Sequence, residues 1–268
     1  MKKNILLGLL IMLGLVLTAC KTDSISTFDY IIDESFDEFI VMGTSADYPP
    51  YEWPKTVDGK LTLVGIDIEI AKEIAKKVGK NLKVVNKNFD FLLEDLESGK
   101  VDFVMAAMTP SEDRKKRVDF SDIYYFAEQV ALIHKDNLNE YTSVESLDQT
   151  TIRIGAQLGT VQQELVDSLF NNAQTRYIKQ IPTLIMNLQD KQIGALVVER
   201  PIAEGYKNNT DDLVIANIDL PQEDDNGFAV AVSKGNTSLL NNINEVLQAL
   251  INSGQMDEIV KTMTELNN

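Results

Sequence analysis

Residues 101–114 read VDFVMAAMTPSEDR, an apolar run that leads directly into the start of a helix. The first part of this run is apolar apart from Asp102, which is typical of a strand buried inside a parallel sheet. Thr109 and Glu112 have the spacing of a capping box, and Pro110 suits the first helical position. Because a helix N-terminus attracts anions, the stretch predicts a buried strand followed by an anion site.

The alternation of strand and helix extends in both directions from this stretch. Residues 67–78 place apolar side chains at helical spacing with Lys and Glu opposite, and the segment ends at Gly79. In this first series, strands are predicted at 39–43, 82–85, 101–106 and 130–135, and helices at 67–78 and 89–98.

A second series of the same kind follows. It predicts strands at 151–156, 175–178, 193–198 and 214–218, with helices at 160–170, 182–191 and 202–208. The chain then closes with a strand at 227–233 and helices at 237–252 and 255–266. This order predicts an α/β protein in which each lobe is a mainly parallel sheet flanked by helices.

The two series divide the chain into two lobes. Residues 38–128 and 225–268 are predicted to form lobe 1, and residues 129–224 to form lobe 2, inserted between them. The chain must therefore pass between the lobes twice. We expect these passages to be two extended crossing strands that act as a hinge.

Composition excludes several classes of function. The chain has 268 residues and a formal net charge of −16, so nucleic acid is not an expected partner of the folded body. Cys20 is the single cysteine and His134 the single histidine. They allow no intrachain disulfide and no Cys/His zinc cluster, and we expect no metal and no cofactor.

The N-terminus has the features of an export signal. Lys2 and Lys3 precede an uncharged, mostly apolar run from Ile5 to Leu17, which is short for a membrane span. The sequence Leu17-Thr18-Ala19-Cys20 resembles a bacterial lipobox, in which the cysteine sulfur is lipidated after cleavage before it. We therefore expect a signal peptide at 1–19, lipidation of Cys20, and a tether at 20–37.

Four sequence blocks together resemble the solute-binding proteins of polar amino acid ABC importers. The blocks are Gly43–Glu52 with Gly65–Ile68, Ala106–Arg114 with Phe120–Tyr124, Ile154–Gln163, and Ile193–Glu199. The resemblance covers nearly all of residues 38–265. It implies a type II periplasmic-binding-protein-like fold, in which two lobes close on an amino acid.

The resemblance assigns roles in lobe 1. Arg114 matches the arginine that pairs with the α-carboxylate of the ligand, for which a guanidinium offers a bidentate fork. Thr109 matches a position that contacts the ligand backbone, and the carbonyl of Ala107 matches an acceptor for the ligand ammonium. Tyr48, Tyr51 and Trp53 are candidates for the aromatic residues of the side-chain pocket, and packing within the lobe is the alternative for Tyr51 and Trp53.

In lobe 2, the resemblance implies that the amides of Thr160 and Val161 complete the carboxylate site and that Glu199 pairs with the ammonium. The sequence departs from the family pattern where Ser45 replaces a frequent aspartate and where Ile66 replaces a frequent aromatic residue. Negative charge for a basic ligand side chain would then come from Asp47 or Glu52.

The expected protein is a lipid-anchored binding component on the extracellular face of a bacterial membrane. Its expected partners are a free polar or basic amino acid, such as arginine, lysine or glutamine, and the permease and ATPase of an importer. A monomer is expected, and not an enzyme. Two alternatives stay open: a dehydratase-type enzyme on the same scaffold, and a ligand-sensing ectodomain.

Overall fold

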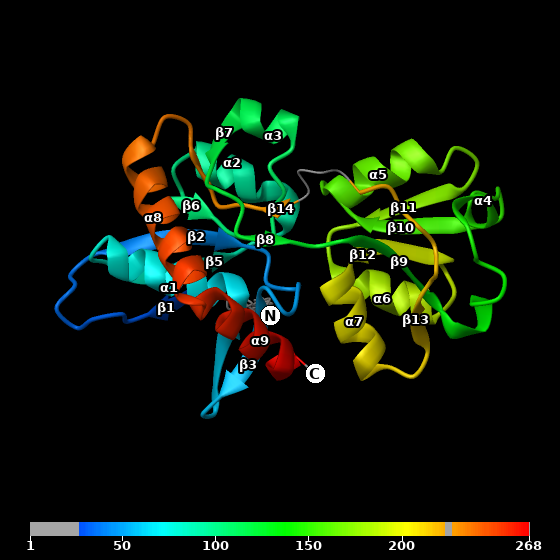
Figure 1. Ribbon diagram of the computed structural model, residues 1–268, viewed down its shortest axis with the longest axis horizontal. Coiled ribbons are helices and arrows are strands. Elements are labelled where there is room, and N and C mark those ends of the chain that lie inside the picture. The colour runs from blue at the N-terminus through cyan, green and yellow to red at the C-terminus, as the bar shows by residue number, and fades with distance from the viewer. Residues whose placement is uncertain (1–26, 223–226, 268) are drawn as a thin grey trace, which may run out of the picture.

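The computed structural model describes residues 27–222 and 227–267. These residues form two lobes, each with its own β-sheet, and the lobes lie side by side in Figure 1. Helices pack around each sheet, so the predicted two-lobed α/β fold is confirmed. Within the described ranges, no helix is both long and apolar enough to cross a membrane.

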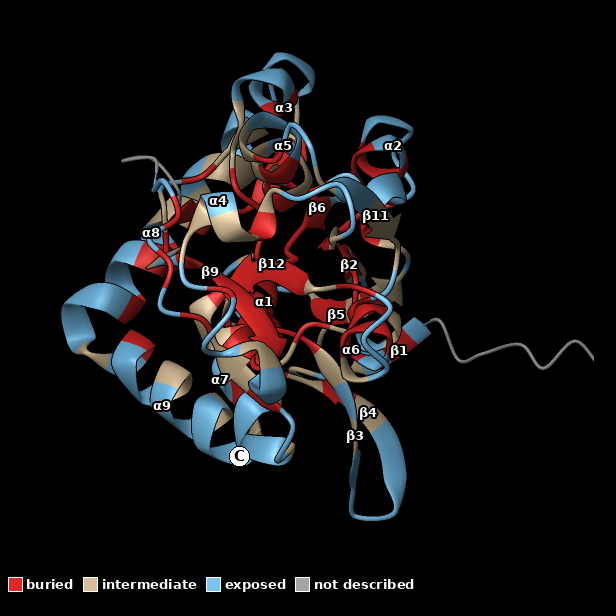
Figure 2. Ribbon diagram, turned by 90° about the vertical axis from the view of Figure 1, so that its right-hand side faces the viewer, coloured by how far each residue is buried: buried red, intermediate tan, exposed pale blue. Residues whose placement is uncertain are grey.

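Lobe 1 contains a six-stranded sheet in the order β1-β5-β2-β6-β15-β7. The strands are β1 (Thr27–Tyr30), β2 (Phe39–Thr44), β5 (Asn81–Asn86), β6 (Phe103–Val104), β7 (Val118–Phe120) and β15 (Ala231–Ser233). The helices are α1 (Ile66–Lys77), the 3₁₀ helix η1 (Phe89–Phe91), α2 (Leu92–Glu97), α3 (Glu112–Arg117), α8 (Thr237–Ser253) and α9 (Gln255–Asn267). A hairpin of β3 (Trp53–Val57) and β4 (Lys60–Val64) projects from this lobe (Figure 2).

Lobe 2 contains a five-stranded sheet in the order β11-β10-β12-β9-β13. The strands are β9 (Gln129–His134), β10 (Arg153–Gln157), β11 (Gln174–Ile178), β12 (Ala195–Glu199) and β13 (Leu213–Ile215). The helices are the 3₁₀ helix η2 (Lys135–Asn137), α4 (Val144–Leu147), α5 (Val161–Leu169), α6 (Ile181–Gln189) and α7 (Arg200–Asn209).

Only the centre of each sheet is parallel. In lobe 1, β2 pairs in parallel with β5 and β6, and in lobe 2, β10 pairs in parallel with β11 and β12. β15 and β9 each follow a passage between the lobes, and both run antiparallel to their neighbours. The parallel strands of each sheet end at the side that faces the other lobe. β9 and β15 start at that side, because the chain has just crossed from the other lobe, so they run in the opposite direction. The prediction of mainly parallel sheets is therefore wrong for the pairs that β9 and β15 form.

Two strands connect the lobes, as predicted. β8 (Tyr125–Phe126) leads from lobe 1 toward β9, and β14 (Gly227–Phe228) leads back toward β15 (Figure 1). β8 and β14 pair antiparallel as a separate two-stranded sheet. Both connections therefore lie together between the lobes, which is the arrangement of a hinge.

The helices and strands next to the pocket are held in place by buried apolar side chains. The predicted apolar stripe of α1 is confirmed, since Ile70, Ala71, Ile74 and Ala75 are fully buried. Figure 2 shows buried strands β9 and β12 inside the molecule and largely exposed turns along α9. Burying one isoleucine side chain, such as Ile70 or Ile74, contributes about 1.5–3 kcal/mol to stability.

The predicted tether over 20–37 is wrong in part. Thr27–Tyr30 forms β1, which pairs antiparallel with β5, and Phe28 is buried. Four residues are too few to show a clear period, and pairing with β5 makes this segment a strand. The predicted signal peptide at 1–19 and the lipidation site at Cys20 lie outside the described residues.

Candidate functional site

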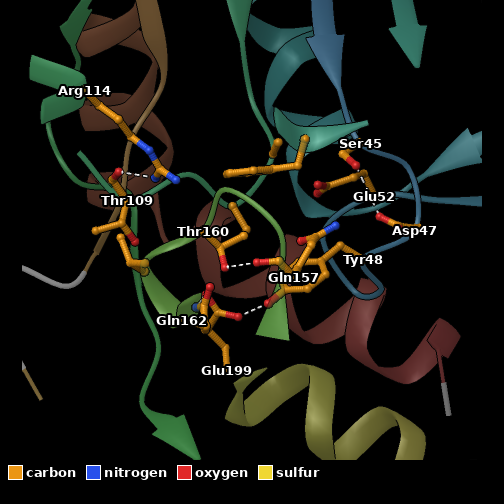
Figure 3. A pocket seen from close by; sticks show the side chains of 14 residues that line it. Ser45, Asp47, Tyr48, Glu52, Thr109, Arg114, Gln157, Thr160, Gln162 and Glu199 are labelled. Atoms are coloured by element: carbon orange, nitrogen blue, oxygen red, sulfur yellow. Dashed lines mark hydrogen bonds between the residues drawn. The ribbon is translucent and has the colours of Figure 1, made fainter. Parts of the chain in front are cut away.

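A pocket lies between the two lobes, beyond the ends of the central strands of both sheets. Ligands of α/β proteins usually bind at this edge, because loops of different strands meet there. Figure 3 shows the side chains that line it. The lining residues are Ser45, Asp47, Tyr48, Glu52, Phe89, Ala106, Ala107, Thr109 and Arg114 from lobe 1, and Gln157, Thr160, Val161, Gln162 and Glu199 from lobe 2.

Arg114 is a buried cation without an acidic partner. Its side chain lies in α3, and the residue is only 8% exposed. The guanidinium donates from Nη1 to the Thr109 carbonyl at 2.6 Å and from Nη2 to the Gly159 carbonyl at 3.0 Å, and it lies over the ring of Phe89. Burial lowers the pKa of Arg114 to about 10, and the more distant carboxylate of Glu164 acts in the opposite direction. A buried charge whose hydrogen bonds go only to carbonyls favours an anion in the adjoining pocket.

The loop between β6 and α3 presents Thr109 and Ala107 to the pocket. Ala107 has a φ of 46°, which a residue other than glycine rarely adopts. Its N–H donates to Oδ2 of Asp67 at 2.9 Å, and Tyr124 Oη donates to Oδ1 of Asp67 at 2.7 Å. The buried Asp67 side chain therefore holds this loop in an uncommon conformation.

The predicted capping box at Thr109 is wrong. α3 begins at Glu112 with Ser111 at the N-cap position, and no side chain caps it. The Thr109 carbonyl accepts instead from Arg114 and from the Ser111 N–H, the latter at 3.0 Å. Because the helix begins three residues after Thr109, the Thr109 side chain lies in the pocket and not on the helix end.

Lobe 2 contributes the N-terminus of α5. Thr160 is its N-cap residue, and Thr160 Oγ1 accepts from the Gln163 N–H at 3.3 Å and donates to the Gln157 carbonyl at 2.8 Å. The helix starts at Val161. The first amides of a helix have no acceptor within it and carry partial positive charge. This helix end therefore adds to the anion-binding character near Arg114.

Glu199 ends β12 and is 2% exposed. One carboxyl oxygen accepts from the hydroxyl of Tyr48, and the other accepts from Gln162 Nε2 at 2.5 Å. Burial raises the pKa of Glu199 to about 8. This carboxyl group would be ionised readily beside a bound cation, so the site offers an acid that complements an ammonium.

Three more acidic or polar groups gather at the side of the pocket opposite Arg114 (Figure 3). Asp47 accepts from the Ile181 N–H at 3.0 Å and from Ser45 Oγ at 3.3 Å, and burial raises its pKa to about 6. Glu52 is fully buried, and burial raises its pKa well above the ordinary range. Among the residues that the structure describes, no three His, Cys, Asp or Glu side chains are placed to hold a metal ion.

The lobes are closed on each other around the pocket. Tyr48 and Asp47 of lobe 1 bond to Glu199 and to the Ile181 N–H of lobe 2. Arg114 bonds to a lobe 2 carbonyl in the same way. Groups from both lobes therefore surround any molecule that occupies this pocket.

The structure brings together the residues predicted for the site except Tyr51 and Trp53. Tyr51 is fully buried and packs against the rings of Tyr125 and Phe228. Trp53 lies on β3 and is absent from the pocket lining, because this strand belongs to the projecting hairpin. Sequence reasoning missed Phe89, Gln157 and Gln162. Gln162 was discoverable, since it lies in the first turn of α5, but Phe89 reads as an ordinary apolar residue of a predicted helix.

Comparisons with known proteins agree with this geometry. Residues 40–264 match the model of the bacterial extracellular solute-binding proteins, family 3. The arginine-binding extracellular protein ArtP of Bacillus subtilis is 33% identical over 264 residues, which is 97% of each chain. The substrate-binding protein AbpA of Streptococcus pneumoniae, an amino acid ABC transporter component solved with L-arginine, has a TM-score of 0.82 and 32% identity, covering 85% of this chain and 95% of AbpA.

A second similar structure is an ancestral amino-acid-binding protein described as a precursor of cyclohexadienyl dehydratase. Its TM-score is 0.77 with 30% identity, covering 84% of this chain and 95% of that one. The family model spans far more than half of the chain, and the arginine-binding relative is similar over nearly its whole length. The chain therefore belongs to the bacterial extracellular solute-binding proteins of family 3.

Proposed function

We propose that this protein captures a free amino acid between its two lobes and delivers it to an ABC importer. The observation that carries the proposal is the buried guanidinium of Arg114, whose hydrogen bonds go only to carbonyl groups and which forms no ion pair with an acid among the described residues. A buried cation of this kind needs an anionic partner, and a carboxylate matches its planar fork.

The pocket matches both charged groups of an amino acid backbone. The α-carboxylate binds Arg114, the Thr109 hydroxyl, and the amides of Thr160 and Val161 at the start of α5. The α-ammonium binds Glu199 and the carbonyl of Ala107. Binding thus joins lobe 1 to lobe 2, and closure excludes water from these charged contacts and strengthens them.

The side chain of the ligand is polar or basic, with arginine the leading candidate ahead of lysine and glutamine. Two observations favour a basic side chain. Asp47 and Glu52 lie across the pocket from Arg114 (Figure 3), and the similar proteins ArtP and AbpA are named for arginine or were solved with it. Tyr48 adds an aromatic ring to the same wall.

The protein acts outside the cytoplasmic membrane, in keeping with its extracellular solute-binding family. Lipid on Cys20 after removal of residues 1–19 anchors it there as a monomer. The closed form is the form that the importer's permease recognises, and the permease works with its ATPase. These assignments rest on the lipobox-like sequence and on the family, and the protein itself transfers no bonds.

Thermal unfolding of the purified protein with each standard amino acid tests the proposal. A ligand present at about 100 times its dissociation constant adds roughly 2.7 kcal/mol to the free energy of unfolding. We expect a large upward shift of the melting temperature for arginine or another polar or basic amino acid. A folded protein whose melting temperature responds to none of them would contradict the proposal.

A further inference from the structure

Glu52 is a buried acid with no cationic partner among the residues that the structure describes. It is 0% exposed, its carboxyl oxygens accept no hydrogen bond from a hydroxyl or N–H group, and the side-chain group that meets it is the carboxyl of Asp67, which is itself an acid. Its backbone is held in place, since the N–H and carbonyl of Glu52 both bond to the backbone of Tyr48. Figure 3 shows the carboxyl group directed into the pocket from the side of Ser45 and Asp47. Such a group is costly to bury unless something pairs with it.

The surroundings of Glu52 contain acids and phenols. Asp47 lies in the same loop and Asp67 comes from α1, and both raise the pKa of Glu52 beyond the effect of burial. The phenols of Tyr51 and Tyr124 lie near it as well, and burial, with a smaller effect of the neighbouring acids, raises the pKa values of both. No lysine, arginine or histidine forms an ion pair with Glu52 among residues 27–222 and 227–267. The uncharged form of Glu52 is therefore favoured in the empty pocket.

The pocket is polarised along its length. Arg114 and Thr109 lie on one side, and Glu52 lies with Asp47 on the other (Figure 3). A ligand whose carboxylate binds Arg114 therefore extends its side chain toward Glu52. A positive group on that side chain would be the missing partner of this carboxyl group.

We propose that Glu52 selects ligands with a cationic side chain by exchanging its own proton for that cation. This inference rests on the proposed function. When the cationic group arrives, the O–H bond of Glu52 breaks, the proton passes to solvent, and the carboxylate pairs with the ligand, which keeps its charge. A neutral side chain leaves the proton on Glu52 and gains only a hydrogen bond.

Because of this exchange, each ligand with a cationic side chain should release a proton from Glu52 when it binds. Arginine and citrulline have the same backbone and nearly the same shape, but citrulline has a neutral urea in place of the guanidinium. Both ligands present an ammonium to Glu199, so proton release from Glu199 is common to both. The difference between the two ligands therefore reports on the acids near the ligand side chain, and Glu52→Gln separates Glu52 from Asp47 and Asp67.

The test is calorimetric titration of the full-length protein, purified in detergent and freed of bound ligand. L-Arginine and L-citrulline are titrated at neutral pH in two buffers of different ionisation enthalpy. Wild type, Glu52→Gln and the exposed control Glu258→Gln on α9 are compared. We expect arginine to release about one proton more than citrulline with wild type and control, and no excess with Glu52→Gln.

The same titrations measure selectivity. We expect Glu52→Gln to reduce the preference for arginine over citrulline by about tenfold or more, because an ionised partner is lost from a buried pair. Equal proton release by the two ligands in wild type would overturn the inference without involving the variant. So would an unchanged preference in Glu52→Gln. Binding of another amino acid by wild type, with no binding of arginine or lysine, would overturn this inference and leave the proposed function standing. Failure of wild type to bind any standard amino acid would overturn both.

Discussion

Lys179 of lobe 2 forms an ion pair of 2.8 Å with Asp90 of lobe 1, outside the ligand pocket. The Lys179 ammonium also lies 4.1 Å from the centre of the Phe91 ring. Asp90 and Phe91 belong to η1, and Lys179 directly follows β11. This contact therefore holds the lobes closed without touching the ligand.

Lys179→Ala should weaken amino acid binding although it leaves the pocket unchanged. The pair is partly exposed, and such pairs are worth about 0.2–1 kcal/mol, so we expect the dissociation constant to rise by about 1.5- to 5-fold. Lys191→Ala is the matched control, since Lys191 pairs with Asp136 inside lobe 2. Calorimetric titration gives both constants.

A double-mutant cycle with Asp90→Ala identifies the cause. If the ion pair stabilises the closed form, Asp90→Ala should have little further effect once Lys179 is removed. Independent, additive effects of the two substitutions would show that the pair does not act as a unit. If Lys191→Ala weakened amino acid binding as much as Lys179→Ala does, the loss of any surface charge would explain the effect.

Arg114→Lys should lower affinity while the protein stays folded. A lysine keeps the charge but replaces a planar fork with a point charge, so one carboxylate oxygen loses its aligned donor. We expect affinity to fall by about tenfold or more. Arg117→Lys on the same helix is the control, because Arg117 pairs with Glu97 on the surface. Similar affinities for both variants would contradict the role given to Arg114.

The unliganded protein should lose stability as the pH rises from about 5 to 8. Burial raises the pKa of Glu199 to about 8 and the pKa values of Asp47 and Asp67 to about 6. A raised pKa means that the folded protein keeps protons that the unfolded chain releases, so this stabilisation is complete at low pH and is lost as pH passes each folded-state pKa.

Melting temperatures measured across this pH range check the sign. Glu199→Gln should remove the part of the decline nearest pH 8 that belongs to this residue, because an amide does not titrate. A bound amino acid should reduce the decline too, since its ammonium compensates ionised Glu199. A melting temperature that rises steadily from pH 5 to 8 in the unliganded wild type would contradict the assignment.

Gly65→Ala should destabilise the protein severely. Gly65 has a φ of 140° at the N-cap of α1, and a Cβ there would overlap the carbonyl of Tyr51. Gly59→Ala is the control, since Gly59 also has a positive φ of 77° but has open space around it. Both variants suffer backbone strain, and only Gly65→Ala adds a collision with backbone. Equal losses in melting temperature would mean that strain alone matters.

Much of the fold was predictable because local patterns and tertiary packing agree. The stripe of α1 and the order of strands and helices were readable from periodicity. β1 was missed because its four residues become a strand only beside β5. The antiparallel direction of β9 and β15 was missed because it depends on how the chain crosses between the lobes, which periodicity does not encode.

The site was predictable where a residue matches the pattern of the family. Glu199 ends the buried strand β12 and Arg114 lies in α3, and the resemblance assigns a charged group of the ligand to each. Phe89 could not be identified, because its position at the pocket depends on how η1 faces Arg114. The position of Glu52 was equally hidden. It depends on the close approach of Gly65 to Tyr51, which brings this loop against Asp67.

The most direct test of amino acid capture is a calorimetric comparison of L-arginine with agmatine, which is arginine without its α-carboxylate. The protein is purified in detergent and freed of bound ligand before titration. We predict that arginine binds at one site per chain and that agmatine binds at least about tenfold more weakly, because the guanidinium of Arg114 then stays unpaired. Equal binding of the two compounds, or no binding of arginine or any other amino acid, would contradict the account.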